Sequence, residues 1–414
     1  MTRSGQPAPI GRHRYDVVIA GARCAGAATA MLLARRGLSV LVVDPMRRGS
    51  DTLSTHALMR AAVLQLARWG LLDTLRAAGT PTIRSTTFHY GEESITLPIK
   101  QRDGVDGLYA PRRTVIDPIL LEAAEAAGAE VALGRSVVDL LRDRDGRVRG
   151  ATIAGTDGRD VDVAADLVIG ADGVRSRIAS LVGAVEEHVA TSATASIYGY
   201  RRDLGVDGFH WYYAAGASVG AIPTNDGDTC VFASLPPKLF ELSRSKGLET
   251  VYREVLEQVS PELAARVAGS APSSKLRGFA GLQGFLRRSA GPGWALVGDA
   301  GYFKDPLTAH GITDALRDAE LLARAVLAGS DDAVAGYQQT RDGLVRGLFE
   351  VTDRIASFEW DLQQVKELHL QLSREMNAEV DLLKTLDETR PASPAGGEGN
   401  SAAGPVGDAR RAVA

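Results

Sequence analysis

One stretch decides the fold: residues 15–44 read YDVVIAGARCAGAATAMLLARRGLSVLVVD. Val17–Ala20 is a short apolar run, typical of a parallel strand that is buried on both faces. The small and apolar residues of Ala25–Arg36 predict a helix packed closely on that strand, with Gly37 placed to end it. A second buried strand follows and ends in Asp44. The stretch therefore predicts a βαβ unit, the beginning of a parallel sheet.

The turn between strand and helix reads GARCAG, with an arginine in the place of a second glycine. In a dinucleotide-binding G-x-G-x-x-G loop, the first glycine (Gly21) permits the tight turn and the third (Gly26) permits close packing of the helix. The free N–H groups at the helix start then face a pyrophosphate. Asp44, 18 residues after Gly26, would accept hydrogen bonds from ribose hydroxyls. Because Arg23 interrupts the pattern, an ordinary strand-to-helix turn is an alternative interpretation.

Two further segments repeat the arrangement of a buried strand followed by a glycine-flanked aspartate. The first is GADGVRS at 170–176, which follows an apolar strand. The second is LVGDAGYFKDPLTAHGITDAL at 296–316, where a proline-containing loop leads to another helix N-terminus. Turn formation or helix capping explains either aspartate alone. Three such elements in this order favour a nucleotide-binding domain.

On these three motifs, residues 14–330 resemble the FAD-dependent monooxygenases of the para-hydroxybenzoate hydroxylase type. They also resemble two related branches, the flavin-dependent halogenases and the geranylgeranyl reductases. The resemblance implies an α/β fold, or α+β composite, in which a Rossmann-type FAD-binding domain is interleaved with a mostly antiparallel β-sheet substrate domain and followed by C-terminal helices.

The chain is expected to pass between the two domains several times. Strand patterns without intervening helices, such as the hairpin pattern at 82–99, mark the substrate domain. The terminal segments are expected to be disordered, since the C-terminal one is low in apolar bulk and rich in Gly, Pro and Ala. We expect the FAD-binding domain at 14–80, 108–184 and 288–330, the substrate domain at 81–107 and 185–287, a helical region at 331–388, and disorder at 1–13 and 389–414.

The resemblance also implies a set of cofactor-binding residues, all for non-covalent FAD. The pyrophosphate would be bound by Gly21, Ala22, Ala25 and Gly26, and the adenosine ribose by Asp44. The adenine would contact the backbone of Val137, and the phosphate or ribityl side would be bound by Arg113. Asp172 belongs to the motif that supports FAD and the passage of NAD(P)H. Asp299 would bind ribityl oxygens, and Pro306 lies in the loop that follows it. The flavin N1 and O2 edge would receive N–H groups from Gly311 and Ile312.

Arg23 is the position without a counterpart in the glycine pattern. A guanidinium there has the right sign to lie beside a pyrophosphate, so we hypothesise that it binds the cofactor. The alternative is that its side chain closes the site and leaves a non-enzymatic binding protein. Cys24 is interpreted as a small buried loop residue rather than a point of covalent flavin attachment.

The chain departs from each branch of the family at one motif. Tyr302 stands where the aromatic hydroxylases have His, and the run FKDPLT at 303–308 is more similar to the halogenases and reductases. Residues 218–223 read SVGAIP, however, where halogenases carry W-x-W-x-I-P and reductases carry Y-x-W-x-F-P. The resemblance therefore implies hydroxylase chemistry on a divergent branch.

Candidate substrate residues come from two segments. The family topology would bring Ser54, Thr55 and His56 near the flavin ring, where His56 would orient substrate or relay a proton. Packing is the alternative for His56, and Ser54 is also expected to cap a helix over 56–69. Trp211 and Tyr213 alternate on a predicted strand and so share one face. They would line an aromatic pocket or lie in the core.

Composition excludes several classes of function. The 414 residues carry a formal net charge of −4, and no run of Lys and Arg is long enough to follow a nucleic-acid backbone. Cys24 and Cys230 match no metal-ligand spacing or disulfide framework, which favours a reducing cytoplasm and no metal. We find no signal peptide, and the glycine-rich centre of the apolar stretch 17–34 argues against a membrane span. We expect a monomer or homodimer without nucleic-acid or membrane partners.

The expected function is that of a single-component flavoprotein monooxygenase. The resemblance implies that FAD, NADH or NADPH, and O2 hydroxylate a small aromatic or polyketide-like substrate through a flavin C4a-hydroperoxide. The alternative is an FAD-dependent reductase or dehydrogenase that uses the same scaffold without oxygen insertion.

Overall fold

The computed structural model describes residues 10–155 and 158–388. The two segments expected to be disordered, 1–13 and 389–414, lie outside the described residues except for 10–13. These four residues lead into the first strand, and the backbone N–H of Gly11 donates to Glu130 Oε1 at 2.6 Å.

The first sheet is built around the stretch that opens the chain. β1 (Arg14–Ala20) lies between β2 (Val40–Asp44) and β8 (Val161–Gly170) and is parallel to both. The parallel strands β5 (Glu130–Leu133) and β17 (Trp294–Leu296) extend the sheet on either side, and β16 (Ala290–Gly291) forms its edge. The hairpin of β6 (Val137–Arg142) and β7 (Val148–Ile153) joins through β8.

Both faces of this sheet are covered, which explains why its strands are apolar throughout. On one face, Val17 and Ile19 pack beneath α1 (Cys24–Ala34), which lies between α4 (Arg113–Ala126) and α10 (Gly311–Leu327). On the other face, Val18 and Ala20 pack with the β6–β7 hairpin and α5 (Arg177–Val182).

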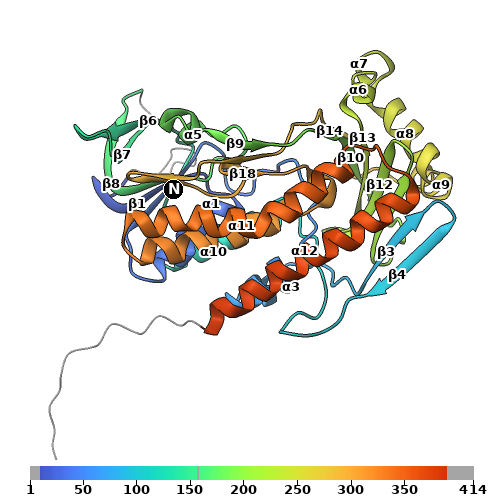
Figure 1. The fold of residues 1–414 in the computed structure, drawn as a ribbon, viewed down its shortest axis with the longest axis horizontal. Coiled ribbons are helices and arrows are strands. Elements are labelled where there is room, and N and C mark those ends of the chain that lie inside the picture. Colours follow the sequence, from blue (N-terminus) through green and yellow to red (C-terminus); the bar gives the residue numbers. More distant parts are fainter. Residues whose placement is uncertain (1–9, 156–157, 389–414) are drawn as a thin grey trace, which may run out of the picture.

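The second sheet is mostly antiparallel, in the order β14-β10-β13-β12-β11-β3-β4 (Figure 1). The pair β11–β3 is parallel, and β3–β4 is the predicted hairpin. The helices α8 (Leu248–Val259) and α9 (Pro261–Ala268) pack on one face. Its strands are β3 (Ser85–Tyr90), β4 (Glu93–Pro98), β10 (Ala195–Arg202), β11 (Phe209–Ala214), β12 (Ala217–Pro223), β13 (Asp228–Leu235) and β14 (Arg277–Phe279).

Two long helices end the described chain. α11 (Asp331–Ala356) packs on α10, and α12 (Leu362–Glu388) returns along α11 to reach α2 (Arg60–Arg68). In Figure 1, α12 crosses from the neighbourhood of β12 to that of α3 (Leu72–Ala77). The remaining elements are the short helices α6 (Pro237–Phe240) and α7 (Ser243–Lys246) and a small sheet of β9 (Glu186–Val189), β15 (Phe285–Arg287) and β18 (Tyr302–Phe303).

The structure confirms the predicted α/β composite and corrects one helix. The helix expected over 56–69 is shorter, because α2 begins at Arg60 with Met59 as its N-cap. Ser54 does not cap it. The Ser54 hydroxyl instead accepts the backbone N–H of His56 at 3.0 Å, and His56 has a left-handed φ of 70° that no helical residue adopts.

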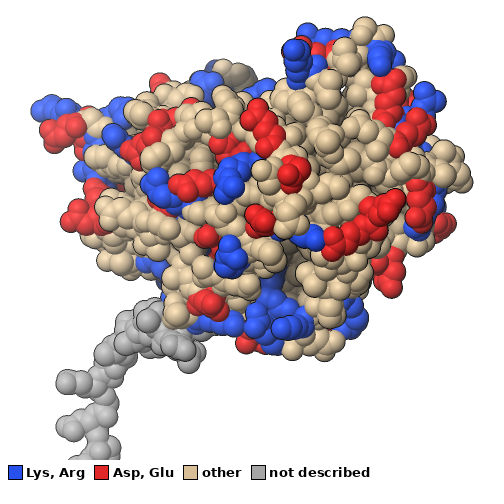
Figure 2. All heavy atoms as spheres, turned by 45° about the vertical axis from the view of Figure 1, so that its right-hand side comes forward, with Lys and Arg blue, Asp and Glu red and all other residues tan. Residues whose placement is uncertain are grey.

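The surface carries both signs of charge. Figure 2 shows acidic and basic side chains interspersed over most of the face in view, with a group of Lys and Arg at its lower edge. Among the residues that the structure describes, no helix has the length and apolar character needed to cross a bilayer. The apolar stretch Val17–Ala34 is divided into β1, a turn and α1, as its central glycines predict.

Candidate functional site

A cavity of about 680 Å³ lies between the two sheets. One wall is formed where the parallel strands of the first sheet end, at Gly21, Asp44, Ala171 and Val297. Ligands of open α/β sheets bind at this edge, because the loops leave the carboxyl ends of the strands there. The opposite wall belongs to β10, β13 and β14 of the second sheet.

The structure explains why two glycines of the first loop cannot be replaced. Gly21 has a φ of 110°, and a Cβ there would lie 2.2 Å from the carbonyl oxygen of Ala171. A Cβ on Gly26 would lie 1.9 Å from the carbonyl oxygen of Gly21. Such contacts are far inside van der Waals distance, so strand, turn and helix approach this closely only with glycine at both positions.

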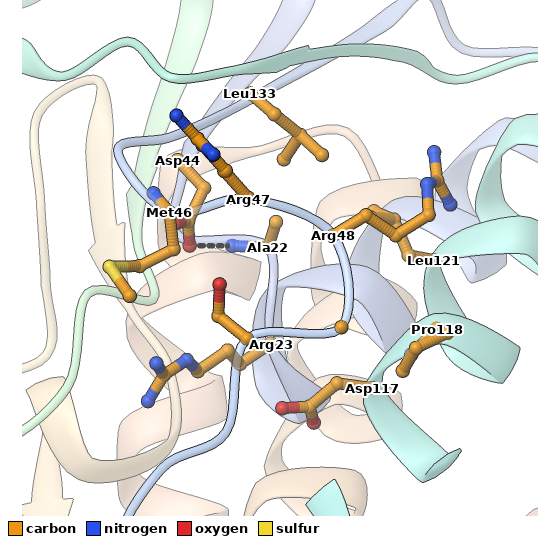
Figure 3. A pocket seen from close by; sticks show the side chains of 12 residues that line it. Ala22, Arg23, Asp44, Met46, Arg47, Arg48, Asp117, Pro118, Leu121 and Leu133 are labelled. Carbon is orange, nitrogen blue, oxygen red and sulfur yellow. Dashed lines mark hydrogen bonds between the residues drawn. The ribbon is translucent and has the colours of Figure 1, made fainter. Parts of the chain in front are cut away.

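Arg23 does not need to be glycine. Its φ of −89° and ψ of −168° are extended backbone that any L-residue adopts, and it is the N-cap of α1 without a side-chain cap bond. Its side chain is half-buried and lines both the main cavity and a smaller pocket beside Asp44 (Figure 3). Within the described chain, the guanidinium has no carboxylate partner, and it therefore leaves its charge available to a ligand.

Asp44 holds the loop that it faces. Its Oδ2 accepts the N–H of Ala22 at 2.8 Å, the dashed line of Figure 3, and its Oδ1 accepts the N–H of Met46 at 2.7 Å. Each carboxylate oxygen retains a further acceptor site. The side chain is thus fixed with acceptors directed at the position expected for a ribose.

Arg113 and Cys24 meet at one carboxylate. Arg113 lines the cavity and pairs with Asp117, with 2.9 Å between its guanidinium nitrogen and Oδ2. The Cys24 thiol donates to Asp117 Oδ1 at 3.0 Å, and burial raises the pKa of this thiol. Cys24 is therefore a buried, protonated thiol, as interpreted, but it is the first residue of α1 rather than a loop residue, and it links α1 to α4.

Asp172 has a structural partner set of its own. Its carboxylate accepts the Ser176 hydroxyl at 2.5 Å and the backbone N–H groups of Arg177 and Ile178 at 2.7 and 3.1 Å. It therefore caps the N-terminus of α5, which is the alternative that the sequence left open. Asp172 also lines the cavity, as does Val137 at the start of β6.

Asp299 and the start of α10 line the same cavity. Burial raises the pKa of Asp299 to about 6, opposed by the charges of Arg113 and Lys304. α10 begins at Gly311 with no side-chain cap, and nothing lies within 4 Å of the place that a Cβ on Gly311 would occupy. Its first N–H groups are therefore free to face a ligand, beside Ile312 and Pro306 on the cavity wall.

His56 reaches the cavity from the loop before α2, together with Ser54 and Thr55. Its Nε2 is hydrogen-bonded to the Tyr200 hydroxyl, and the Arg112 guanidinium lies 3.7 Å from the centroid of that tyrosine ring. Burial, and next to it the charge of Arg112, lowers the pKa of His56 well below its usual value. The imidazole is therefore neutral near pH 7.

The structure does not bring Trp211 and Tyr213 to this cavity. Trp211 donates through Nε1 to the Thr86 hydroxyl at 3.0 Å, and Tyr213 packs on His369 of α12 with 4.4 Å between ring centroids. The wall of the second sheet consists of other residues, for which the sequence offered only strand alternation without saying which face meets the cavity. On that wall the unpredicted residues are Ser196, Tyr198, Phe232, Ser234 and Phe279, and the cavity is also lined by Phe303 of β18 and by Lys304, which follows it.

Comparison with known proteins agrees with this geometry. A family described as FAD binding domain matches residues 14–348. Digeranylgeranylglycerophospholipid reductase 1 of Methanopyrus kandleri is 28% identical over 373 residues, which cover 85% of this chain and 93% of that protein. Menaquinone reductase of Mycolicibacterium smegmatis is also 28% identical, over 83% of this chain and 84% of its own length.

Solved structures share the fold at lower identity. The flavin-dependent brominase Bmp2 superposes with a TM-score of 0.75 at 19% identity, covering 91% of this chain and 100% of that one. PqsL of Pseudomonas aeruginosa, described as a probable FAD-dependent monooxygenase, has a TM-score of 0.72 at 21% identity and covers 86% of this chain and 99% of its own. The chain thus belongs to the FAD binding domain family and is an FAD-dependent oxidoreductase.

Proposed function

We propose that the protein is a single-component monooxygenase of the para-hydroxybenzoate hydroxylase type that hydroxylates a small aromatic or polyketide-like substrate. The observation that supports this proposal is the continuity of the cavity. One end has the glycine loop and Asp44, and the same cavity continues past Asp299 and Gly311 to the aromatic side chains of the second sheet. A dinucleotide and a second, ring-shaped ligand would share it.

The residues of the first end fit FAD. The uncapped start of α1 and the guanidinium of Arg23 would meet the pyrophosphate, and Asp44 would accept hydrogen bonds from the adenosine ribose. Asp299 would accept hydrogen bonds from ribityl hydroxyls, and the start of α10 would stabilise negative charge on the flavin edge. When bound, FAD supplies hydride transfer from NADH or NADPH and the activation of O2.

The other end fits a planar and largely apolar substrate. Phe232, Phe279 and Phe303 offer aromatic surfaces, and the hydroxyls of Ser196 and Ser234 lie 3.0 Å apart on the same wall. The neutral imidazole of His56, held by the Tyr200 hydroxyl, would orient a substrate hydroxyl. These groups would position the ring and exclude water from the flavin.

A second candidate is a reductase that transfers hydride to its substrate without inserting oxygen. It is supported by the two relatives described above, both of which are named as reductases. We further propose a cytoplasmic monomer or homodimer, as expected from the sequence.

Isotope labelling separates the two candidates. Purified protein with FAD is mixed with NADH or NADPH and a panel of aromatic and polyketide-like compounds under ¹⁸O2. The monooxygenase proposal expects one ¹⁸O atom in the product and no turnover without O2. A product that gains two hydrogens under nitrogen, without label, would instead establish the reductase.

A bulkier side chain in the cavity tests whether the wall of the second sheet contacts the substrate. Ser234→Leu adds bulk to the aromatic end, so we expect KM for the substrate to rise about tenfold or more, equivalent to about 1.4 kcal/mol, while FAD binding stays unchanged. Ser245→Leu on the exposed helix α7 is the control, and it should leave KM unaltered. Equal KM values for the unaltered protein, Ser234→Leu and Ser245→Leu would show that this wall does not contact the substrate.

A further inference from the structure

A cluster of buried charges lies beneath the N-terminus of α10. It draws on three parts of the chain: the loop before α10, α10 itself and the C-terminal helix α12. None of these residues was predicted to act in the reaction. The α10 cluster consists of Lys304, His310, Asp314, Arg317, Asp318 and Glu379, each at most 5% exposed.

The cluster is connected by alternating charges. Lys304 Nζ pairs with Asp314 Oδ2, and the other oxygen of Asp314 lies 2.5 Å from Arg317. Arg317 also pairs with Asp318 at 2.6 Å and with Glu379 at 2.8 Å. Glu379 Oε2 and His310 Nε2 form a hydrogen bond with 2.7 Å between the two atoms. Two cations thus face three carboxylates, with α12 supplying one of them.

This arrangement argues against a metal centre. Ligand atoms of His310, Asp314 and Glu379 lie within 4.8 Å of one another, close enough to hold an ion. Both carboxylates are already paired with Lys304 or Arg317, however, and these cations would repel a metal ion. The pairing of these carboxylates with cations therefore disfavours a metal ion, although His310 Nδ1 and Asp318 Oδ2 have no hydrogen-bond partner among the described residues.

Lys304 connects the cluster to the cavity. Lys304 and Asp314 line the same cavity as Asp299, Gly311 and Ile312, although the lysine side chain is only 3% exposed. An ammonium so deeply buried persists only because its carboxylate partner compensates for lost hydration. Its charge therefore lies on the same side of the cavity as the open N-terminus of α10, whose partial charge has the same sign.

We propose that Lys304 is a positioning residue whose charge, added to that of the α10 N-terminus, favours reduction of the bound flavin, and that Glu379 of α12 maintains that charge. The inference rests on FAD binding at this site and is independent of whether oxygen is inserted. A positive charge beside the flavin edge stabilises the negative charge that reduction adds there. The last helix of the described chain is thereby part of the redox site.

The effect is expected to depend on pH in a defined direction. Burial, followed by the charge of Arg317, lowers the pKa of Lys304 to about 7, while Glu379, Asp299 and Asp318 oppose the shift. Lys304 thus carries its charge below pH 7 and loses it above. Other groups that face it behave differently: burial lowers the pKa of His310 to about 4, and Tyr302 stays protonated because burial raises its pKa.

Reduction potentials test the role of Lys304. They are measured on the FAD-loaded protein by equilibration with redox dyes at pH 6 and pH 9, without substrate or O2. We expect Lys304→Met to disfavour reduction about tenfold at pH 6, about 30 mV for a two-electron couple, and to match the unaltered protein at pH 9. Lys304→Arg should match it at pH 6 and be more easily reduced at pH 9.

The control keeps Lys304 and removes a cation elsewhere. Lys366→Met on α12 breaks a pair with Glu93 far from the cavity lining, and it should leave both potentials unchanged. Because burial raises the pKa of Asp299 and the charge of Lys304 lowers it, the comparison is repeated in the Asp299→Asn background, where this second titration is absent. Equal potentials at pH 6, or an equal shift at both pH values, would overturn the proposal. If Lys304→Met does not retain FAD, Lys304→Arg decides, since no difference from the unaltered protein at pH 9 overturns it too.

Glu379→Gln tests the part assigned to α12. Because Glu379 supports the charge of Lys304, its loss should move the pH-dependent step of the potential to lower pH. Glu367→Gln on the exposed side of α12 is the matched control and should leave the midpoint in place. An unmoved midpoint in Glu379→Gln would exclude α12 from the redox site.

Discussion

Arg23 shows how a single position can break a sequence pattern without losing the site. The glycine pattern asks for three small residues, but the backbone requires glycine only at Gly21 and Gly26. At Arg23 the extended backbone admits any side chain, and the guanidinium lines the cavity without a carboxylate partner among the described residues. What remains to be measured is how much Arg23 adds to the affinity of the protein for FAD.

Removing the Arg23 side chain should weaken FAD binding. A hydrogen bond to a charged group contributes about 1.5–3 kcal/mol, so Arg23→Ala should raise the Kd for FAD roughly tenfold to a hundredfold, measured by fluorescence titration of the apoprotein. Arg23→Gly should behave similarly. Arg36→Ala, at the exposed far end of α1, serves as the control. Unchanged or tighter FAD binding in Arg23→Ala would show that the arginine side chain does not contribute to FAD affinity.

Asp299 makes a prediction about pH. Its pKa is about 6 in the fold against 3.8 for the ordinary side chain, so the folded apoprotein holds this proton more tightly than the unfolded chain. The contribution is present in full below pH 3.8 and is lost as pH rises through 6. Denaturant unfolding should show the apoprotein losing stability relative to Asp299→Asn across this window. A difference that is flat with pH would contradict the raised pKa. Asp305, whose pKa burial also raises to about 6, is common to both proteins.

At the scale of elements, strand alternation predicts which residues share a face but not what that face meets. Trp211 and Tyr213 do lie on one face of β11, as predicted. On that face Trp211 bonds to Thr86 of the neighbouring strand β3 and Tyr213 packs on α12, whereas β10 and β13 line the cavity. The helix expected at 56–69 failed for a related reason: the loop that carries His56 adopts a left-handed turn to reach Tyr200.

Trp211→Ala should therefore act on stability and not on the ligand sites. Loss of a buried aromatic side chain costs about 3–5 kcal/mol, to be measured by denaturant unfolding of the FAD-loaded protein. The Kd for FAD should remain within twofold of the original. If the KM for the substrate rises while the stability is retained, Trp211 belongs to the substrate site as first predicted.

At the scale of the whole molecule, one apolar core joins the two sheets. The same cluster contains Val17 and Ile19 of β1, Tyr198 and Phe232 of the second sheet, and Leu383 of α12. Neither sheet has this core to itself, because the chain passes between the sheets several times and the long helices seal the junction (Figure 1).

A shared core predicts shared unfolding. Calorimetry of the FAD-loaded protein should show one principal transition, since residues of both sheets lose the same contacts together. Excess FAD at 100 times Kd should add about 2.7 kcal/mol of stability to the entire transition. Two separated transitions, of which FAD moves only one, would mean that the sheets unfold independently.

Much of the fold, and the motif residues that line the cavity, are readable from residue order. The βαβ unit, the hairpin at 82–99 and the helical character of 331–388 follow from local periodicity, and each is confirmed; the division of the last region into two helices was not predicted. The cavity residues Gly21, Asp44, Asp172, Asp299 and Gly311 belong to three motifs that are informative together rather than singly. The residues of the second sheet carry no such spacing, because a cavity wall and a core wall have the same alternation.

The sequence by itself determined the βαβ unit and its glycine turn, because these depend on residues close together in the chain. Only the tertiary structure decided which part of the second sheet lines the cavity and which charges lie beside the start of α10. Glu379 reaches Arg317 across 62 residues, and His56 reaches Tyr200 across 144. No local pattern specifies such pairs, since they exist only once the helices and sheets have packed.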